Sequence, residues 1–400
     1  MGGQLNIIVG VTGGIAAYKA VNVIRGLVLA GHDVHVVATD AALRFVGKPT
    51  LEAISRNIVH TDLYEGVAEV RHVAIGQAAD LIVIAPATAN TIAKLAAGLV
   101  DDLLGNTVLA SRAPVVIAPA MHTEMWQHPA TVHNIAVLRS RGVTIVGPAV
   151  GKLTGADSGP GRLEEWTEIV RAALAVLQPK DLAGRRILVT AGGTREALDP
   201  VRYLGNRSSG KQGIALATAA ATRGADVTLV GANLEAEAPS SVRVLHVGST
   251  LELASAVQDV APGVDAVIMA AAVADYRPEF VADSKIKKEV GGDRVTLELV
   301  RNPDILARLA ETRRPGQLIV GFAAETEPDR DALLALGRAK IARKGSDLLV
   351  LNRVGWREGF GTDDNSIVLL DRLGDIVMEA SGSKQTVADR ILDAVVARLA

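Results

Sequence analysis

Short runs of aliphatic residues recur along the first half of the chain without the polar alternation that is typical of half-buried strands. Alanine-rich stretches with apolar residues at helical spacing separate these runs. A strand without a polar face is buried on both sides, so the pattern predicts parallel strands with helices on both faces of a sheet. The runs are LNIIVGV (5–11), DVHVVAT (33–39), LIVIAP (81–86), VVIAP (115–119) and VTIVGP (143–148).

The same cycle starts again after PKDLAG (179–184), which is typical of a linker. With 400 residues the chain can bury two separate cores. The sequence therefore predicts an α/β protein of two Rossmann-like, doubly wound domains, at residues 1–178 and 184–400. The runs of the second domain are RILVTAG (186–192), DVTLVGA (226–232), VRVLHV (242–247), DAVIMAAA (265–272), QLIVGFAA (317–324) and DLLVLNRV (347–354).

The composition of the chain excludes several classes of partner and of catalytic group. The formal net charge is −2, so neither nucleic acid nor a membrane surface is an expected partner. The chain has no cysteine, which excludes disulfides, thiolate metal sites and a catalytic protein thiol. The first ten residues lack a signal-peptide pattern, and Pro86 and Lys94 interrupt the longest apolar stretch, 81–100. We expect a cytoplasmic enzyme that acts on small molecules.

A glycine-rich turn, GVTGGIAAYKA (10–20), follows the first strand, where ligands of such sheets bind. Gly13 and Gly14 let the backbone approach an anion, and the following helix N-terminus offers N–H donors and about half a positive charge. The turn alone is equally consistent with phosphate binding and with a tight structural connection. A nicotinamide dinucleotide is an alternative, because Asp40 is placed like a ribose-binding acid, but the glycine order differs from G-x-G-x-x-G.

Three further segments that follow strands carry a family resemblance: RHV (71–73), APATANTIAKLAAGLVDDL (85–103) and APAMHTEMW (118–126). They resemble the homo-oligomeric flavin-containing cysteine decarboxylases, which act on phosphopantothenoylcysteine or on peptidyl-cysteine. The resemblance implies a flavodoxin-like domain that binds FMN, with His72 as a catalytic residue whose imidazole serves as a base or an orienting group beside the substrate. It assigns Gly13, Gly14, Ile15 and Thr39 to the FMN phosphate, Pro86, Ala87, Thr88 and Asn90 to a flavin-contacting loop, and His122, Met125 and Arg162 to the substrate.

Two positions depart from that family. His122 stands where the family usually has Asn, and the imidazole would then have to bind the substrate carboxylate. The family's flap cysteine, which reprotonates the enethiol product, aligns with Gly155 in the segment GKLTGADSGPGRL (151–163). Asp157, Ser158 or water are alternative proton donors, and a reaction that stops at the enethiol is a further alternative.

The second domain begins with a long loop between strand and helix, AGGTREALDPVRYLGNRSSGKQG (191–213). Its glycines and hydroxyls can cradle an anion. This loop, together with AAAVADYRP (270–278), KIKK (285–288), RNPDIL (301–306), GFAAET (321–326) and the pair Lys340 and Lys344, resembles the phosphopantothenate–cysteine ligase family. The resemblance implies that CTP and Mg²⁺ activate the acyl carboxylate as an acyl-cytidylate, which the amine of cysteine then attacks.

Within the ligase resemblance, Lys285 contacts the triphosphate, Asn206 serves the aminolysis step and Arg207 meets the phosphate of 4'-phosphopantothenate. Taken alone, KIKK is typical of a solvated charged loop. No metal ligands are assigned. The remaining substrate-binding residues are Met269, Ala270, Ala271, Asp275, Asn302, Pro303, Asp304, Ile305, Phe322, Lys340 and Lys344.

Together the two resemblances cover nearly the whole chain and imply a bifunctional enzyme of coenzyme A biosynthesis. Its C-terminal domain would join 4'-phosphopantothenate to cysteine, and its N-terminal domain would decarboxylate the product to 4'-phosphopantetheine. They also imply flavin sites formed between subunits and hence a homo-oligomer, a dodecamer of flavin-domain trimers linked by ligase-domain dimers. The alternatives are a two-domain nicotinamide oxidoreductase and a flavin or nucleotide sensor that has lost catalysis.

Overall fold

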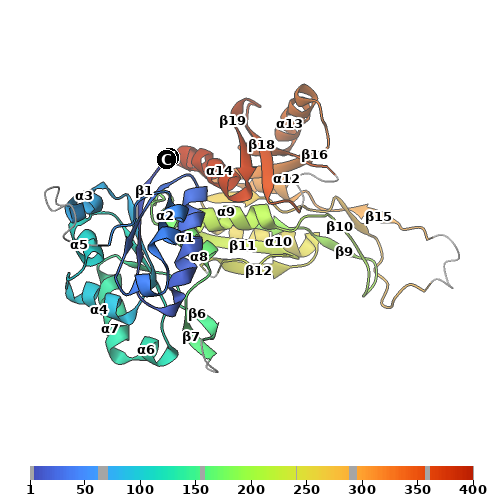
Figure 1. Cartoon of the computed structure of the whole chain (residues 1–400). Helices are drawn as coiled ribbons and strands as arrows, with labels where there is room; N and C mark the ends of the chain where they lie inside the picture. Colours follow the sequence, from blue (N-terminus) through green and yellow to red (C-terminus); the bar gives the residue numbers. More distant parts are fainter. Residues whose placement is uncertain are drawn as a thin grey trace. The chain divides into compact units, whose positions relative to one another are not determined.

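The computed structural model describes residues 4–61, 71–153, 158–239, 241–287, 295–355 and 361–399. The chain divides into two compact units, Met1–Gln178 and Pro179–Ala400 (Figure 1). Each unit has a central sheet with helices on both faces, which confirms the predicted α/β class. Among the described residues, no helix has both the length and the apolar character required to cross a bilayer.

Five parallel strands form the main sheet of the first unit, in the order β2-β1-β3-β4-β5. Along β1, Ile7 and Val9 enter one apolar cluster and Ile8 enters the other, so both faces of the strand are buried. The strands are β1 (Asn6–Val11), β2 (Asp33–Ala38), β3 (Leu81–Ala87), β4 (Val115–Pro119) and β5 (Thr144–Ile145).

Helices α1 and α8 pack on one face of this sheet, and α4, α5 and α7 pack on the other. Helix α2 packs on the same face as α1 and α8, and helix α3 packs on the same face as α4, α5 and α7. A short helix, α6, and an antiparallel hairpin of β6 and β7 follow later strands. The bounds are α1 (Ala20–Leu29), α2 (Lys48–Ser55), α3 (Arg71–Ala78), α4 (Ala89–Ala97), α5 (Leu103–Ala110), α6 (Thr123–Gln127), α7 (Pro129–Ser140), β6 (Ala149–Lys152), β7 (Ser158–Arg162) and α8 (Trp166–Ala175).

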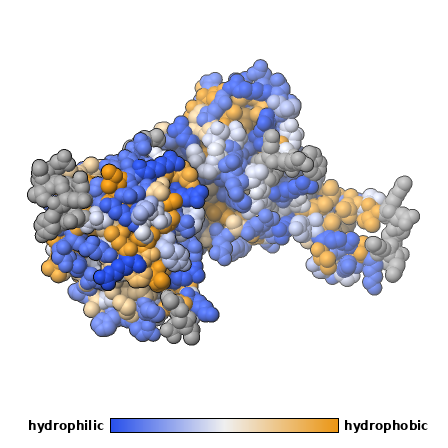
Figure 2. Space-filling view, viewed as in Figure 1, coloured by the Kyte–Doolittle hydropathy of each residue, from blue (hydrophilic) through white to orange (hydrophobic). Residues whose placement is uncertain are grey.

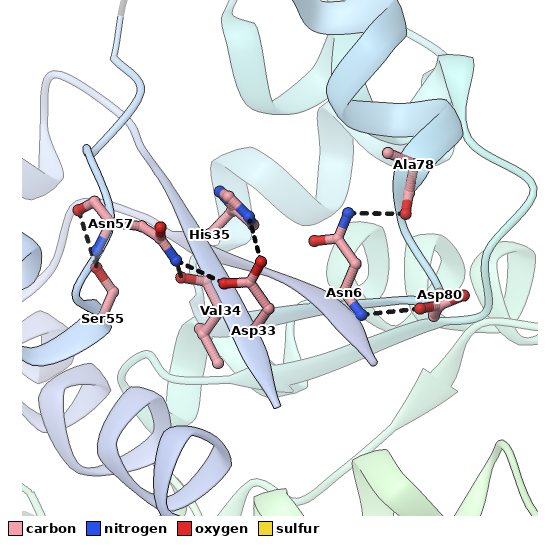
Figure 3. Close-up of polar contacts among 8 residues, drawn as sticks. All are labelled: Asn6, Asp33, Val34, His35, Ser55, Asn57, Ala78 and Asp80. Carbon is pink, nitrogen blue, oxygen red and sulfur yellow. Dashed lines mark hydrogen bonds and ion pairs between the residues drawn. The ribbon is translucent and has the colours of Figure 1, made fainter. Parts of the chain in front are cut away.

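Polar side chains secure the edge of the first sheet where β1 and β2 begin (Figure 3). The backbone N–H of Asn6 donates to Asp80 at 2.8 Å, and its side chain donates to the carbonyl of Ala78 at 2.8 Å. Asn57 donates to Asp33 at 2.8 Å, and this hydrogen bond lowers the pKa of the Asp33 carboxyl. This edge lies at the opposite end of the strands from the carboxyl ends, where ligands of parallel sheets bind.

The second unit contains an eight-stranded sheet, in the order β12-β11-β8-β13-β16-β17-β18-β19. The strands from β12 to β17 are parallel, whereas β18 and β19 are antiparallel additions that the sequence pattern does not predict. The strands are β8 (Arg186–Gly192), β11 (Asp226–Ala232), β12 (Arg243–Val247), β13 (Ala266–Met269), β16 (Leu318–Glu325), β17 (Leu348–Arg353), β18 (Asp364–Asp371) and β19 (Ile376–Ser383).

Helices α9 (Lys211–Thr222) and α14 (Lys384–Leu399) share one face of the second sheet. Helices α10 (Thr250–Val260) and α12 (Ile305–Thr312) cover the other face, and α13 (Arg330–Lys344) packs against β17. A Cβ at Gly213 would lie 2.4 Å from the Cβ of Ala191, so glycine lets α9 approach β8 closely. This close approach sets the start of α9 beside the carboxyl end of β8.

Two small antiparallel hairpins complete the second unit and form what we call the arm. They pair β9 (Arg195–Ala197) with β10 (Tyr203–Gly205) and β14 (Tyr276–Pro278) with β15 (Leu299–Arg301). The arm extends away from the sheet of its own unit (Figure 1), and apolar side chains gather on it (Figure 2). Its exposed apolar residues are Val201, Tyr203, Tyr276, Phe280, Val281, Val295, Leu297 and Leu299.

A buried arginine ties α9 to α14 and to the first residues of the second unit. Only 5% of the Arg223 side chain is exposed, and it pairs with Asp181 at 2.6 Å and Asp393 at 2.8 Å. The hydrogen bond from Arg223 holds the pKa of Asp181 below its ordinary value. A carboxylate with a lowered pKa stabilises the fold above its ordinary pKa and loses that contribution as the pH falls through the lowered value.

We expect Arg223→Met to lower the free energy of unfolding of the second unit by about 2 kcal/mol at pH 7. Urea unfolding should show the difference narrowing as the pH falls below about 4, because the wild type progressively loses the contribution of the lowered pKa of Asp181 as the pH approaches that lowered value. Arg330→Met is the matched control, since Arg330 pairs with Glu379 on the surface, and an exposed pair contributes at most about 1 kcal/mol. A deficit of the same size at every pH would contradict this account.

Candidate active sites

A cavity of about 1230 Å³ opens at the carboxyl ends of the strands of the first unit. Segments that follow β1, β2, β3 and β4 contribute to its walls. Its volume is ample for a flavin mononucleotide and a small substrate. Of the residues assigned from the sequence, the lining contains Gly13, Gly14, Ile15, Thr39, Pro86, Thr88, Asn90, His122, Met125 and Arg162.

The two glycines of the first turn have different roles. A Cβ at Gly13 would lie 2.3 Å from the Cβ of Ala41, so packing alone requires glycine there. A Cβ at Gly14 would meet only Thr88, at an ordinary 3.5 Å, so packing does not explain that glycine. Gly14 lines the cavity, where a missing side chain leaves the backbone accessible to a ligand. A five-residue 3₁₀ helix, Ile15–Lys19, follows and leads into α1.

A buried threonine that the sequence patterns did not single out joins two walls of this cavity. Thr12 is 1% exposed, and its hydroxyl donates to the carbonyl of Pro86 at 2.7 Å. The same hydroxyl accepts the backbone N–H of Thr88 at 3.1 Å. The glycine turn and the 86–91 loop are thus held together by a side chain that lies beneath the cavity.

The assigned substrate-binding segments are also joined. The backbone N–H of Met121 donates to the carbonyl of Gly161 at 2.9 Å. A Cβ at Gly161 would lie 2.2 Å from the carbonyl oxygen of Met121, so β7 can approach this segment only through a glycine. His122 and Arg162 are therefore brought to the same cavity from distant parts of the sequence. Ser158 begins β7, whereas Gly155 and Asp157 lie outside the described residues.

His72 is not among the residues that line the cavity of its own unit. It is half-buried in α3, whose Gly76 lies against the carbonyl of Thr107 in α5, with only 2.6 Å between that oxygen and a Cβ at Gly76. Ala87 is also absent from the lining, because it is fully buried at the end of β3. The assigned catalytic histidine thus does not line the cavity that contains most of the assigned FMN-binding residues.

A second cavity, of about 510 Å³, lies beyond the carboxyl ends of β8, β13 and β16 in the second unit. Of the residues assigned from the sequence, its lining contains Asn206, Met269, Ala270, Ala271, Asp275, Asn302, Pro303, Asp304, Ile305, Phe322, Lys340 and Lys344. Arg207 and Lys285 are not part of the lining. The neighbours of Arg207, Asn206 and Ser208, belong to the lining, whereas no residue from 276 to 287 does.

Buried polar groups shape the floor of the second cavity. The hydroxyl of Thr194 accepts the backbone N–H of Ala274 at 2.9 Å. Asn302 is 8% exposed, and its side chain donates to the carbonyl of Ala274 at 2.9 Å. The backbone N–H of Asn302 donates to the carbonyl of Asp275 at 2.8 Å. Asn206 donates to the carbonyl of Val273 at 3.3 Å, so the 273–275 segment is held from three sides.

Cations dominate the walls of this cavity. Lys340 pairs with Glu325 at 2.7 Å, and Lys344 pairs with Asp304, the N-cap of α12. Burial alone would raise the pKa of Asp304, but the hydrogen bonds from Lys344 and the backbone of Ala307, together with the charges of Lys344 and Arg343, keep that pKa below its ordinary value. Such an excess of positive charge favours a polyanionic ligand. The basic lining residues are Lys211, Arg301, Lys340, Arg343, Lys344 and Lys384, and the acidic ones are Asp275 and Asp304.

Lys211, Arg343 and Lys384 were not assigned from the sequence. Lys211 lies in the quoted segment SSGKQG, whereas Arg343 and Lys384 carried no motif signal. The part of the chain that the structure describes contains no group of three or more His, Asp or Glu side chains poised to hold a metal ion.

Solved structures resemble each half of the chain. The C-terminal domain of a coenzyme A biosynthesis bifunctional protein, CoaBC, is 35% identical, with a TM-score of 0.46, over 55% of this chain and 98% of its own. A phosphopantothenoylcysteine (PPC) decarboxylase mutant, in complex with pantothenoylaminoethenethiol, is 30% identical, with a TM-score of 0.41, over 44% of this chain and 98% of its own.

Relatives match the chain from end to end. The coenzyme A biosynthesis bifunctional protein CoaBC of Mycolicibacterium smegmatis is 53% identical over 100% of this chain and 99% of its own. The protein of the same name from Mycobacterium tuberculosis H37Rv is 54% identical over 98% and 97%, and that of Vibrio cholerae is 43% identical over 96% of each.

Two family models divide the chain between them. The model named Flavoprotein matches residues 1–178, and the model named DNA/pantothenate metabolism flavoprotein C-terminal domain matches residues 182–399. The two cavities lie one in each of these matched regions. The chain therefore belongs to the family of bifunctional coenzyme A biosynthesis enzymes, which combine a flavoprotein decarboxylase domain with a ligase domain.

Proposed function

We propose that the chain converts 4'-phosphopantothenate and cysteine to 4'-phosphopantetheine in two steps, with the ligase in residues 184–400 and the decarboxylase in residues 1–178. The observation that carries the proposal is the contrast between the two strand-end cavities. One is large and is bordered by glycine and hydroxyl groups, and the other is lined by cations. The proposed compartment is the cytoplasm, because it keeps the substrate thiol reduced.

In the ligase step, the carboxylate oxygen of 4'-phosphopantothenate forms a bond to the α-phosphorus of CTP, and the bond to pyrophosphate breaks. The amine of cysteine then attacks the acyl carbon, CMP leaves and the amine loses a proton. Negative charge develops on pyrophosphate in the first step, so cations near the phosphates stabilise its transition state. The lysines Lys340 and Lys344 supply this charge when the triphosphate displaces Glu325 and Asp304 from them.

Mg²⁺ fits this site as an ion that arrives with the nucleotide. Magnesium commonly uses one or two carboxylates together with substrate phosphates rather than an all-protein cage. The cavity lining supplies Asp275 as such a carboxylate, and no larger cluster of metal ligands occurs among the described residues. Asn206, whose amide already holds the carbonyl of Val273, is the proposed residue for the aminolysis step.

In the decarboxylase step, the proposed FMN site uses Gly14 and Thr39 for the phosphate and Thr88 and Asn90 for the flavin. FMN, when bound, supplies the two-electron oxidation of the thiol-bearing carbon that makes loss of the carboxylate feasible. His122 and Arg162 offer donors for the substrate carboxylate, since both line the same cavity. The two electrons would return to the decarboxylated product, so the net reaction releases CO₂ and consumes no external oxidant.

His72 completes this site from a second copy of the chain in our proposal. The family resemblance implies flavin sites formed between subunits, and His72 lies outside the lining of its own cavity. The arm of the second unit supports a further contact between copies, because its apolar side chains are exposed. Exposed apolar patches of this kind mark association surfaces. Trimers at the flavin domain and dimers at the arm would build the proposed dodecamer.

We expect Phe280→Asp to reduce the oligomer to a species of lower mass, because Phe280 is 81% exposed on the arm and a charge there opposes burial. Light scattering at several protein concentrations measures the mass. Leu373→Asp is the matched control, since Leu373 is 86% exposed in the turn between β18 and β19, away from the arm. Equal masses for wild type and Phe280→Asp would remove the arm from the assembly.

A single product assay tests the proposed function. The purified protein with 4'-phosphopantothenate, cysteine, CTP and Mg²⁺ should release pyrophosphate, CMP and CO₂ and form 4'-phosphopantetheine. The protein should be yellow from FMN, whereas a nicotinamide oxidoreductase would be colourless. A sensor without catalysis would bind ligands but release no product. Accumulation of phosphopantothenoylcysteine without CO₂ would leave only the ligase half of the proposal.

A further inference from the structure

The segment that carries Lys285 is fixed to a neighbouring turn by a buried carboxylate. Asp199 lies in the turn between β9 and β10, and its side chain is fully buried. Its Oδ2 accepts a hydrogen bond from the backbone N–H of Ile286, at 3.2 Å. Ile286 directly follows Lys285, so this contact lies next to the residue assigned to the triphosphate.

Arg202 completes the contact. Its Nε and Nη2 donate to Oδ2 of Asp199 at 3.0 and 2.6 Å, and Nη2 also donates to the carbonyl of Ile286 at 2.7 Å. Both peptide groups that flank the Cα of Ile286 are therefore held. The backbone N–H of Ala282 donates to the carbonyl of Leu198 at 3.0 Å, which attaches the segment to the same turn a second time.

The other oxygen of the same carboxylate shapes the turn. Oδ1 of Asp199 accepts the backbone N–H groups of Val201 and Arg202, both at 2.8 Å, as in an Asx turn. Burial alone would raise the pKa of Asp199, but the hydrogen bonds from Arg202 and from the backbone of Val201 and Ile286 hold it well below its ordinary value. Asp199 is therefore an anion at neutral pH, and it serves the turn and the segment together.

The Lys285 side chain itself is exposed, and it donates to no acceptor among the described residues. A lysine that must reach a bound triphosphate loses conformational freedom when it does so. That loss is smaller if the backbone next to the lysine is already fixed. The contacts of Asp199 and Arg202 to Ile286 provide this fixed point while leaving the ammonium group available.

We infer that Asp199 is a positioning residue for Lys285 in acyl-cytidylate formation. The inference rests on the proposed ligase function, in which Lys285 meets the triphosphate. Asp199 is buried beneath the turn, so it acts on the reaction through the backbone of Ile286. A purely structural carboxylate would affect folding but would not couple to Lys285, and this difference can be measured.

The variant Asp199→Asn separates the two roles of the carboxylate. It keeps an acceptor for the N–H groups of Val201 and Arg202 but turns an amide NH₂ toward the N–H of Ile286. We expect amide hydrogen exchange at Ile286 to accelerate at least about 10-fold and pyrophosphate release to slow about 10- to 100-fold. Aminolysis of preformed acyl-cytidylate should stay within about 3-fold of wild type.

The matched control is Asp181→Asn, which weakens another Asp–Arg pair of the second unit, the one with Arg223. It should leave pyrophosphate release within about 2-fold of wild type, because Asp181 has no contact with the segment that carries Lys285. This control separates a general effect of weakening an ion pair in the unit from the specific effect at Ile286.

The decisive measurement is pyrophosphate release in the Asp199→Asn, Lys285→Gln double variant. If Asp199 acts through Lys285, its substitution costs less than about 2-fold once Lys285 is Gln. Losses that multiply in the double variant would overturn the inference, as would unchanged exchange at Ile286 in Asp199→Asn. Absence of pyrophosphate release from the wild-type protein would instead refute the ligase proposal, and the inference would fall with it.

Discussion

Replacing His72 with Asn should lower CO₂ release from phosphopantothenoylcysteine by about 10³-fold and leave ligation unchanged. A positioned imidazole that transfers a proton commonly contributes about 10² to 10⁴ in rate, and asparagine cannot replace it in this role. His72 belongs to the first unit, whereas the cation-lined cavity belongs to the second. Released CO₂ and pyrophosphate can be measured in the same reaction. A parallel loss of both activities would contradict the assignment of separate sites.

The same variant tests the second-subunit origin of the histidine. Co-expressed with His122→Ala, an otherwise inactive partner, His72→Asn should regain decarboxylation, because about a quarter of the sites between subunits then receive both native residues. The control is a mixture of the two variants purified separately and combined without subunit exchange. Failure to regain activity in the co-expressed oligomer would place both residues in one copy of the chain.

The buried strands of both units could be predicted because their own residues identify them, without knowledge of the neighbouring strands. A strand covered by helices on both faces is apolar throughout, as β3 is, and this pattern is visible in the sequence alone. The outer strands could not be predicted in this way. Strand β19 (Ile376–Ser383) is largely exposed and contains Glu379, Gly382 and two serines, so its composition is that of a loop. Only its pairing with β18 makes it a strand.

Some residues of the candidate sites could likewise be predicted from the sequence, whereas others could not. Residues in the segments that follow strands, such as Thr39 after β2 and Asp275 after β13, could be named because the fold sends strand ends to one edge of the sheet. The supporting residues Thr12 and Asp199 could not, because their partners lie far along the chain: Pro86 for the first and Ile286 for the second. These two residues stand out because their polar side chains are buried, and this burial is visible only in the structure.

The residues that the family resemblance assigns to the sites also differ from the residues that line the two cavities. The resemblance named His72, Arg207 and Lys285, but the two cavities are lined without them. A motif indicates which residue types a reaction requires. The structure of a single chain shows only which residues lie together within that chain. A residue outside the lining must therefore reach the ligand by movement of its side chain or segment, or come from another copy. For His72, the co-expression of His72→Asn with His122→Ala tests the second of these routes.

Asn206→Asp should stop the ligase after its first step. The amide of Asn206 donates to the carbonyl of Val273 at 3.3 Å, and a carboxylate at this position would place an oxygen against that carbonyl and a negative charge beside the attacking amine. We expect a burst of pyrophosphate equal to the enzyme concentration, followed by turnover that is slower by about 10²-fold or more. Rapid-quench analysis should then recover acyl-cytidylate.

The complementary variant is Lys344→Gln, which removes a cation from the same cavity and should suppress the pyrophosphate burst itself. One variant therefore accumulates the intermediate, and the other fails to form it. This opposite order cannot result from general damage to the second unit, which would weaken both steps in both proteins. Multiple turnovers at the wild-type rate in Asn206→Asp would exclude Asn206 from aminolysis, and the amine of cysteine would then need another partner in the 273–275 segment.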